Sequence, residues 1–78
     1  MKSDEILLLL AMRRHGPRRD DFATTIGASC GIHPRRTERL LEKWVDKGWW
    51  EFGVSLRSGW LTPEGERVAD AHSAQWAK

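Results

Sequence analysis

The stretch IGASCGIHPRRTERLLEKWVDKG, residues 26–48, contains the clearest fold signal in this chain of 78 residues. Gly31 follows one short apolar segment, and Pro34 begins a longer segment that Gly48 closes. Glycine readily takes the left-handed conformation that ends a helix, and proline is tolerated at a first helical position. Two helices joined by a turn of about three or four residues that contains glycine are typical of a helix-turn-helix. The stretch therefore predicts this motif, with its second helix over residues 34–47.

The helix predicted over residues 34–47 has one apolar side and one charged side. The residues at helical spacing that we expect to be buried are Thr37, Leu40, Leu41, Trp44 and Val45. The charged residues of the opposite side are Arg35, Glu38, Arg39 and Glu42, with Arg36 and Lys43 on the flanks. Two interpretations are open at this point. The charged side is either a solvated surface on which Glu38 and Glu42 pair with neighbouring cations, or a surface that binds a polyanion.

A short helix is predicted directly before the glycine turn. Asp20 or Asp21 is its expected N-cap, because aspartate side chains accept hydrogen bonds from the first unpaired N–H groups of a helix. Phe22, Ile26 and Cys30 repeat at i, i+4 and i+8, and they predict a narrow apolar stripe. Cys30 is therefore expected to be an inert core thiol, with a redox sensor as the alternative.

A further helix is predicted over the N-terminal segment that ends at Gly16. Ser3 is its expected N-cap, because the acids Asp4 and Glu5 that follow suit the positive end of a helix dipole. The apolar residues at helical spacing are Leu7, Leu10 and Ala11, and Ile6 and Leu8 widen this side. We expect these residues to form the buried face, and Arg13 and Arg14 to be solvated.

After Gly48 the pattern changes from helical to β-type. WWEFGV, residues 49–54, is aromatic and β-branched, SLRSG indicates a turn, and WLT indicates a short return strand. Thr62 and Pro63 then provide the N-cap and first residue of a final helix that ends near Trp76. The residues available for its packing are Leu61, Val68, Ala69, His72 and Trp76. The chain is expected to be a single domain over residues 1–78, mainly α-helical with a small β-hairpin.

The composition restricts the class of protein further. The net charge is only +2, but residues 13–39 hold seven Lys and Arg against three Asp and Glu, a candidate footprint for nucleic acid. The single cysteine allows neither an internal disulfide nor a zinc site built on several thiolates, and it suits a reducing compartment. The apolar run at residues 6–11 is too short to span a bilayer. We expect a soluble, cytoplasmic protein without contact to a membrane.

The sequence carries no recognisable catalytic constellation. No nucleophile lies at a recognisable spacing from a base, and no glycine-rich loop is present to cradle phosphate. The carboxylates lie among arginines on predicted helices. We therefore expect no enzymatic activity, and neither a cofactor nor a metal.

The order and spacing of these segments resemble the winged helix-turn-helix repressors of the MarR/ArsR type. The similarity covers residues 20–68. Gly31-Ile32 matches the turn, with His33 where serine or threonine is usual. The buried positions of the recognition helix are matched by Thr37, Leu41 and Trp44, its end by Lys47 and Gly48, and the junction between wing and last helix by residues 61–65.

This resemblance implies a winged helix-turn-helix that binds double-stranded DNA. The helix over residues 34–47 would enter the major groove, where arginine donates to guanine and a carboxylate accepts from cytosine. The wing, residues 49–62, would lie along the DNA backbone. The residues placed at the DNA are Arg18, Arg19, His33, Arg35, Arg36, Glu38, Arg39, Lys43 and Arg57. The chain would then be a small transcriptional regulator, of a size that also suits a phage or a mobile element.

The five tryptophans support an alternative function. Trp44 and Trp49 match core positions, whereas Trp50, Trp60 and Trp76 are more aromatic surface than so small a protein buries easily. Exposed aromatic residues commonly mark interfaces. The alternative is therefore a protein-protein interaction module, or a homodimer, that uses the wing base and the last helix and leaves the basic helix solvated.

Overall fold

The computed structural model describes the backbone of residues 1–76 and the side chains of residues 1–74. This part is mainly helical with one small antiparallel hairpin, as the sequence predicts. The elements in chain order are α1 (Ser3–His15), α2 (Ala23–Ser29), α3 (Pro34–Lys47), β1 (Trp50–Glu51), the 3₁₀ turn η1 (Leu56–Ser58), β2 (Trp60–Leu61) and α4 (Pro63–Trp76). Both α3 and α4 have the predicted bounds. None of these helices is long and apolar enough to cross a membrane.

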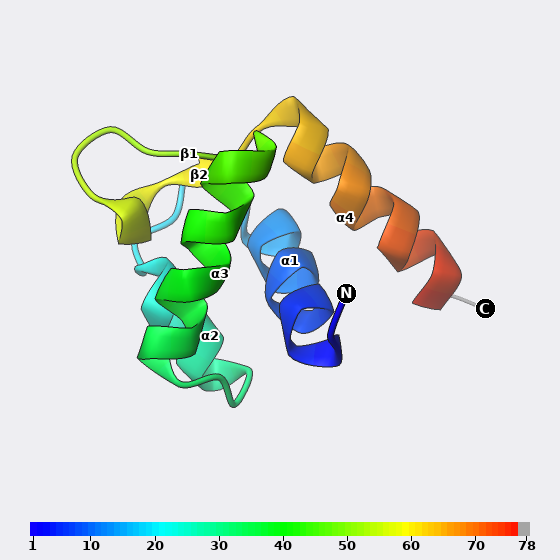
Figure 1. The fold of residues 1–78 in the computed structure, drawn as a ribbon, viewed down its shortest axis with the longest axis horizontal. Helices are drawn as coiled ribbons and strands as arrows, with labels where there is room; N and C mark the ends of the chain where they lie inside the picture. The colour runs from blue at the N-terminus through cyan, green and yellow to red at the C-terminus, as the bar shows by residue number, and fades with distance from the viewer. Residues whose placement is uncertain (77–78) are drawn as a thin grey trace.

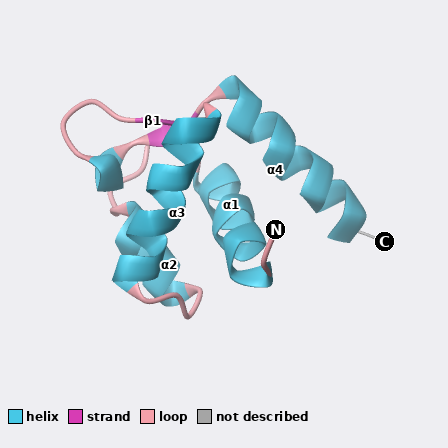
Figure 2. Ribbon diagram, viewed as in Figure 1, coloured by secondary structure: helices cyan, strands magenta, loops and turns pink. Residues whose placement is uncertain are grey.

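All four helices and the hairpin contribute to one core (Figure 1). α2 packs against α3 and α1, and α4 packs along α1 on the side away from the hairpin. Figure 2 shows that most of the hairpin is loop, because β1 and β2 are two residues each. The buried apolar residues are Leu8, Leu9, Ala11, Met12, Ala23, Ile26, Ile32, Leu40, Leu41, Trp44, Trp50 and Ala69.

The turn between α2 and α3 has the backbone that the sequence predicts. Gly31 has a φ of +80°, and the N–H of the buried Ile32 donates to the carbonyl of Gly27 over 2.8 Å. His33 is the N-cap of α3, where its Nδ1 accepts a hydrogen bond from the backbone N–H of Arg35 over 3.1 Å. An imidazole nitrogen thus takes the place of the hydroxyl or carboxylate oxygen that caps most helices.

The two helices of this motif approach most closely where Gly27 faces Thr37. Both residues are buried, and a Cβ added at Gly27 would collide with the Thr37 hydroxyl. Because a protein interior is close-packed, any larger residue at this position would force the helices apart. Gly27 therefore lets α3 lie directly on α2, and this contact fixes which side of α3 points outward.

The hairpin and the start of α4 also follow the prediction. Trp50 pairs with Leu61, and Glu51 pairs with Trp60. The Thr62 hydroxyl donates to the carbonyl of Gly48 over 2.6 Å and accepts from the N–H of Gly65 over 3.1 Å. Thr62 is therefore the predicted N-cap of α4, and it also ties this helix to the end of α3.

The predicted caps of α1 and α2 are wrong. Lys2, not Ser3, is the N-cap residue of α1, and it makes no side-chain cap hydrogen bond. Phe22 is the N-cap residue of α2, so neither Asp20 nor Asp21 caps it. Phe22 has an extended backbone, with φ −67° and ψ 153°, which starts the helix later than an aspartate cap would require. Its side chain is exposed instead of lying in the buried stripe.

The predicted buried face of α1 is also displaced. The buried residues are Glu5, Leu8, Leu9, Ala11 and Met12, whereas Leu7 is exposed. Four consecutive leucines, residues 7–10, fit more than one helical phase, so the pattern does not determine which of them face inward. The same uncertainty applies to Val45 at the edge of the apolar side of α3, which is exposed rather than buried.

Candidate nucleic-acid interface

The exposed side of α3 includes a line of residues whose charge changes sign along the helix. At helical spacing this line contains Arg35, Arg39, Glu42 and Asp46, and all four are exposed. We call these four residues the outer ridge. Its N-terminal half is basic and its C-terminal half is acidic. The two halves therefore attract different ligands, although they belong to the same helix.

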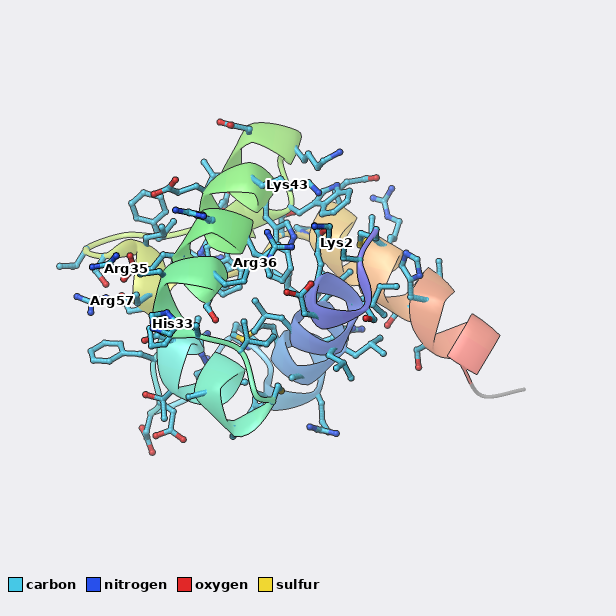
Figure 3. All side chains as sticks on the ribbon, turned by 60° about the horizontal axis from the view of Figure 1, so that its bottom comes forward. Lys2, His33, Arg35, Arg36, Lys43 and Arg57 are labelled. Carbon is cyan, nitrogen blue, oxygen red and sulfur yellow. The ribbon has the colours of Figure 1, made fainter. Side chains whose placement is uncertain are left out.

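The two arginines of the outer ridge are available to a ligand. Among the residues that the structure describes, neither Arg35 nor Arg39 makes an ion pair or a side-chain hydrogen bond. Figure 3 shows the side chain of Arg35 beside those of His33 and Arg57, at the end of α3 where the helix begins. The His33 ring is committed to its capping hydrogen bond through Nδ1. Three cationic or polar side chains thus meet at one end of the helix.

Arg57 reaches this end of α3 from the hairpin. It lies in η1, and its guanidinium carbon is 5.6 Å from the centroid of the Phe22 ring. An aromatic face attracts a guanidinium group, so the exposed Phe22 holds Arg57 in place. The interface therefore combines α3, the hairpin and the start of α2. The sequence pattern missed Phe22, because it assigned this residue to the core.

Arg19, which we predicted to contact phosphate, makes its contacts within the protein. Its Nη1 donates to the carbonyl of Gly59 over 2.5 Å, its Nη2 donates to the carbonyl of Arg57 over 3.1 Å, and its guanidinium lies 5.5 Å from the Trp50 ring centroid. Partial burial lowers the pKa of Arg19. These contacts fasten the α1–α2 loop to the hairpin, so Arg19 positions Arg57 instead of pointing outward. Its neighbour Arg18 is exposed and remains a candidate contact.

Arg36 and Lys43 are directed toward α1, and we call them the inner pair. Arg36 Nε donates to Asp4 over 2.9 Å, and Lys43 Nζ donates to Glu5 over 3.0 Å. The hydrogen bond and charge of Arg36 lower the pKa of Asp4 and outweigh the opposing effect of its partial burial. Figure 3 shows both cationic side chains on the α1 side of α3, away from Arg35 and Arg57. These ion pairs hold α3 against α1, and the prediction that Arg36 and Lys43 contact DNA stays a prediction.

Glu5 is the residue that sequence reasoning misread most. Only 1 % of it is exposed, and its second carboxylate oxygen accepts a hydrogen bond from Trp44 Nε1 over 2.9 Å. The sequence suggested only an acid in the first turn of a helix. The available signal was the spacing of Glu5, Leu8 and Met12 at i, i+3 and i+7, which places a carboxylate on an apolar face.

The ion pairs of the alternative interpretation, in which Glu38 and Glu42 pair with neighbouring cations, are not formed among the described residues. Neither carboxylate is paired in the described part of the chain, where five ion pairs involve other acids. Glu38 is half-buried. It is therefore available to accept a hydrogen bond from a ligand that lies against Arg35 and Arg39.

The basic segment before α2 divides between structural and exposed residues. Arg13 is exposed, as expected, but it also binds α4 through Glu66 over 2.8 Å and Asp70 over 3.0 Å. The hydrogen bond to Asp70 is the main cause that raises the pKa of Arg13. Arg14 is exposed, as predicted. The sequence does not show that Arg13 is paired in the described structure and Arg14 is not, because the partners of Arg13 lie more than fifty residues away in the sequence.

The structure tests two of the three tryptophans of the predicted interaction surface, and it excludes Trp50 from that surface. Trp50 is only 2 % exposed, and its Nε1 donates to the carbonyl of Leu56 over 2.9 Å. Trp60 is 37 % exposed. The side chain of Trp76 lies outside the described residues. Trp44 is buried as predicted, and Trp49 is half-buried against the core.

Other site chemistry is limited in the described part of the chain. Cys30 is a free thiol, half-buried and packed against the core, so it lies on the predicted stripe without full burial. No group of three or more His, Cys, Asp and Glu among the described residues is placed to hold a metal ion.

Comparison of the chain with protein-family models, with curated proteins and with solved structures gives no match.

Proposed function

We propose that the chain is a winged helix-turn-helix protein that binds double-stranded DNA in a sequence-dependent manner. The observation that carries this proposal is the pair Arg35 and Arg39, which are adjacent, exposed and unpaired in the described structure, with Arg57 of the hairpin beside them. In this proposal the N-terminal half of α3 enters the major groove and the hairpin is the wing.

The chemistry of the basic half of the outer ridge supports a base-reading role. An arginine guanidinium donates two parallel hydrogen bonds to O6 and N7 of guanine, and a carboxylate accepts from N4 of cytosine. Glu38 lies on the same exposed end of α3 as Arg35 and is unpaired within residues 1–74. Arg18 and Arg57 are proposed to contact phosphate on either side, because both are exposed and cationic.

The acidic half of the outer ridge constrains the docking geometry. Glu42 and Asp46 would be repelled by phosphate oxygens, so the helix is proposed to dock by its N-terminal half only. Occupancy of an operator or promoter would then regulate transcription in the cytoplasm, where a free Cys30 is stable. No catalytic role belongs to this proposal.

Fluorescence polarisation with a pool of randomised duplexes, measured over a salt series, tests the proposal. We expect Arg35→Ala and Arg39→Ala each to weaken binding by about tenfold to a hundredfold, because one base contact contributes roughly 1 to 3 kcal/mol. Arg67→Ala is the matched control, since Arg67 is an exposed arginine of α4 that pairs with Glu64. Equal affinity of all three variants and the parent protein would show that α3 does not read DNA.

A further inference from the structure

A shallow groove separates the C-terminal half of α3 from the hairpin. It has a volume of about 450 Å³, and it is lined by Glu42, Val45, Asp46, Phe52 and Leu56. Its apolar surface comes from both elements, and its two carboxylates belong to the acidic half of the outer ridge. The groove is thus at the opposite end of α3 from Arg35, and nothing in the proposed function uses it.

The apolar residues of the groove are exposed to an unusual degree. Phe52 is 44 % exposed and Val45 is 37 % exposed, whereas the large residues that face the other side of α3 are buried. Val54, two residues beyond Phe52 in the hairpin loop, is fully exposed. Contiguous exposed apolar side chains, an aromatic one among them, are typical of surfaces that bind protein.

The two carboxylates restrict the chemistry of the ligand. Glu42 and Asp46 pair with no residue of the described structure, and the same is true of Asp20, Asp21, Glu38 and Glu51. What distinguishes Glu42 and Asp46 is that both line the groove beside its apolar residues. Two unpaired carboxylates beside an apolar surface repel phosphate and attract ammonium or guanidinium groups. Charge complementarity therefore disfavours a nucleic acid and favours a cationic ligand.

We propose that this groove binds a short basic and apolar segment of a partner protein. An aliphatic side chain of the segment would lie against Phe52, Val45 and Leu56, and flanking lysine or arginine would pair with Glu42 and Asp46. The groove is small and open, so a weak and transient complex is expected, as is usual for interfaces of small area. The proposal does not depend on DNA binding. Phe52 and Leu56 belong to the hairpin, but no side chain that lines the groove is among those assigned to contact DNA.

A set of three short fluorescein-labelled peptides tests the proposal by fluorescence polarisation in the absence of DNA. The first contains lysine and leucine, the second glutamate and leucine, and the third lysine and serine. We expect the parent protein to bind the lysine–leucine peptide about tenfold more tightly than either other peptide, because only this peptide satisfies both the charge and the apolar surface. Absence of binding, or equal binding of the glutamate–leucine peptide, would overturn the proposal.

Variants locate the binding site on the protein. We expect the double variant Glu42→Gln and Asp46→Asn to weaken binding by about tenfold, from the loss of two ion pairs. Phe52→Ser should weaken it at least as much. The matched control is Asp20→Asn with Asp21→Asn, which removes the same charge from an exposed site outside the groove. An equal loss in the control pair would show non-specific attraction and refute the groove.

Backbone NMR gives a readout that does not rely on the variants. Addition of the lysine–leucine peptide should shift the amide signals of Val45, Phe52 and Leu56, and it should leave that of Arg35 unchanged. Shifts confined to another surface would refute the proposal even if the peptide binds.

Discussion

The inner pair and the two arginines of the outer ridge belong to the same helix, but the side chains of the inner pair are directed toward α1 and those of the outer ridge toward solvent. Arg36 and Lys43 reach Asp4 and Glu5 of α1, at 2.9 Å and 3.0 Å, whereas Arg35 and Arg39 reach no partner in the described structure. Arg35 and Arg36 are consecutive in the sequence, and Arg39 and Lys43 are four residues apart, yet their contacts differ. The proposed interface therefore consists of cations that folding leaves unpaired, and the number of cations in the segment does not identify it.

The energetic reason lies in burial. Lys43 pairs with a carboxylate that is almost entirely buried, and a buried charge is costly unless it is paired and hydrogen-bonded. If Lys43 left Glu5 to bind a phosphate, the buried carboxylate would lose its ion pair and the fold would be less stable. Arg35 and Arg39 pair with no carboxylate of the described structure, so binding a ligand would break no ion pair. They can therefore transfer their full hydrogen-bonding capacity to a ligand.

The largest effect is expected from removal of the buried partner. Glu5→Ala should lower the free energy of unfolding by about 3 kcal/mol, because it leaves the Trp44 indole N–H without its acceptor and opens a cavity. Urea denaturation measures this loss. Glu5→Gln is the matched control and should lose less, since its amide oxygen can still accept from Trp44. A parent-like stability of Glu5→Ala would contradict the structural role of the inner pair.

The next largest effect that we expect is a difference in DNA affinity between a variant of the outer ridge and a variant of the inner pair. Arg39→Ala should reduce DNA affinity by about tenfold or more and lower the salt dependence of binding, whereas Arg36→Ala should change neither by more than about twofold. Both substitutions remove one arginine from α3, so they are matched in charge. Titrations at several salt concentrations measure both quantities. Equal losses in the two variants would mean that the direction of the side chain does not matter.

The same contrast exists between Arg18 and Arg19, which are neighbours in the α1–α2 loop. Arg19→Gln should lower the free energy of unfolding by about 1 to 2 kcal/mol, because it removes two hydrogen bonds to hairpin carbonyls and the contact with Trp50. Arg18→Gln should leave stability unchanged. Thermal and urea denaturation of the two variants measure the difference.

A double-mutant cycle tests whether Arg19 acts on DNA through Arg57. If Arg19 positions Arg57, then Arg19→Gln should weaken DNA binding in the parent but not further in the Arg57→Gln background. Additive losses would indicate instead that Arg19 contacts DNA itself. The cycle is measured by the same polarisation titrations.

The smallest effect that we expect is the pH dependence of the stability that the Arg36–Asp4 ion pair contributes. Arg36 lowers the pKa of Asp4 below its ordinary value of 3.8, so this pair stabilises the fold above that pH. The contribution is lost as the pH falls through the lower pKa of the folded protein. The difference in stability between the parent and Asp4→Asn should therefore be largest near neutral pH and vanish in strong acid. In the Arg36→Ala background, Asp4→Asn should produce no such pH-dependent difference.

The sequence determined the elements whose signals are local. Pro34 and Gly48 mark the ends of α3, and Thr62-Pro63 marks the start of α4, because each acts through the backbone of its own segment. The repeat of Thr37, Leu40, Leu41 and Trp44 also identified the buried side of α3 correctly. Its complement, the exposed position of Arg35 and Arg39, followed from the same periodicity.

Only the tertiary structure decided which cations are unpaired and which apolar residues are exposed. Arg36 and Asp4, or Arg13 and Asp70, are far apart in the sequence, and a long flexible side chain selects its partner only after the helices have packed. The inward phase of the four leucines of α1, the burial of Trp50 and the exposure of Phe22 likewise depend on which element covers each residue. Periodicity identifies a face of a helix, but the neighbouring elements determine what that face meets.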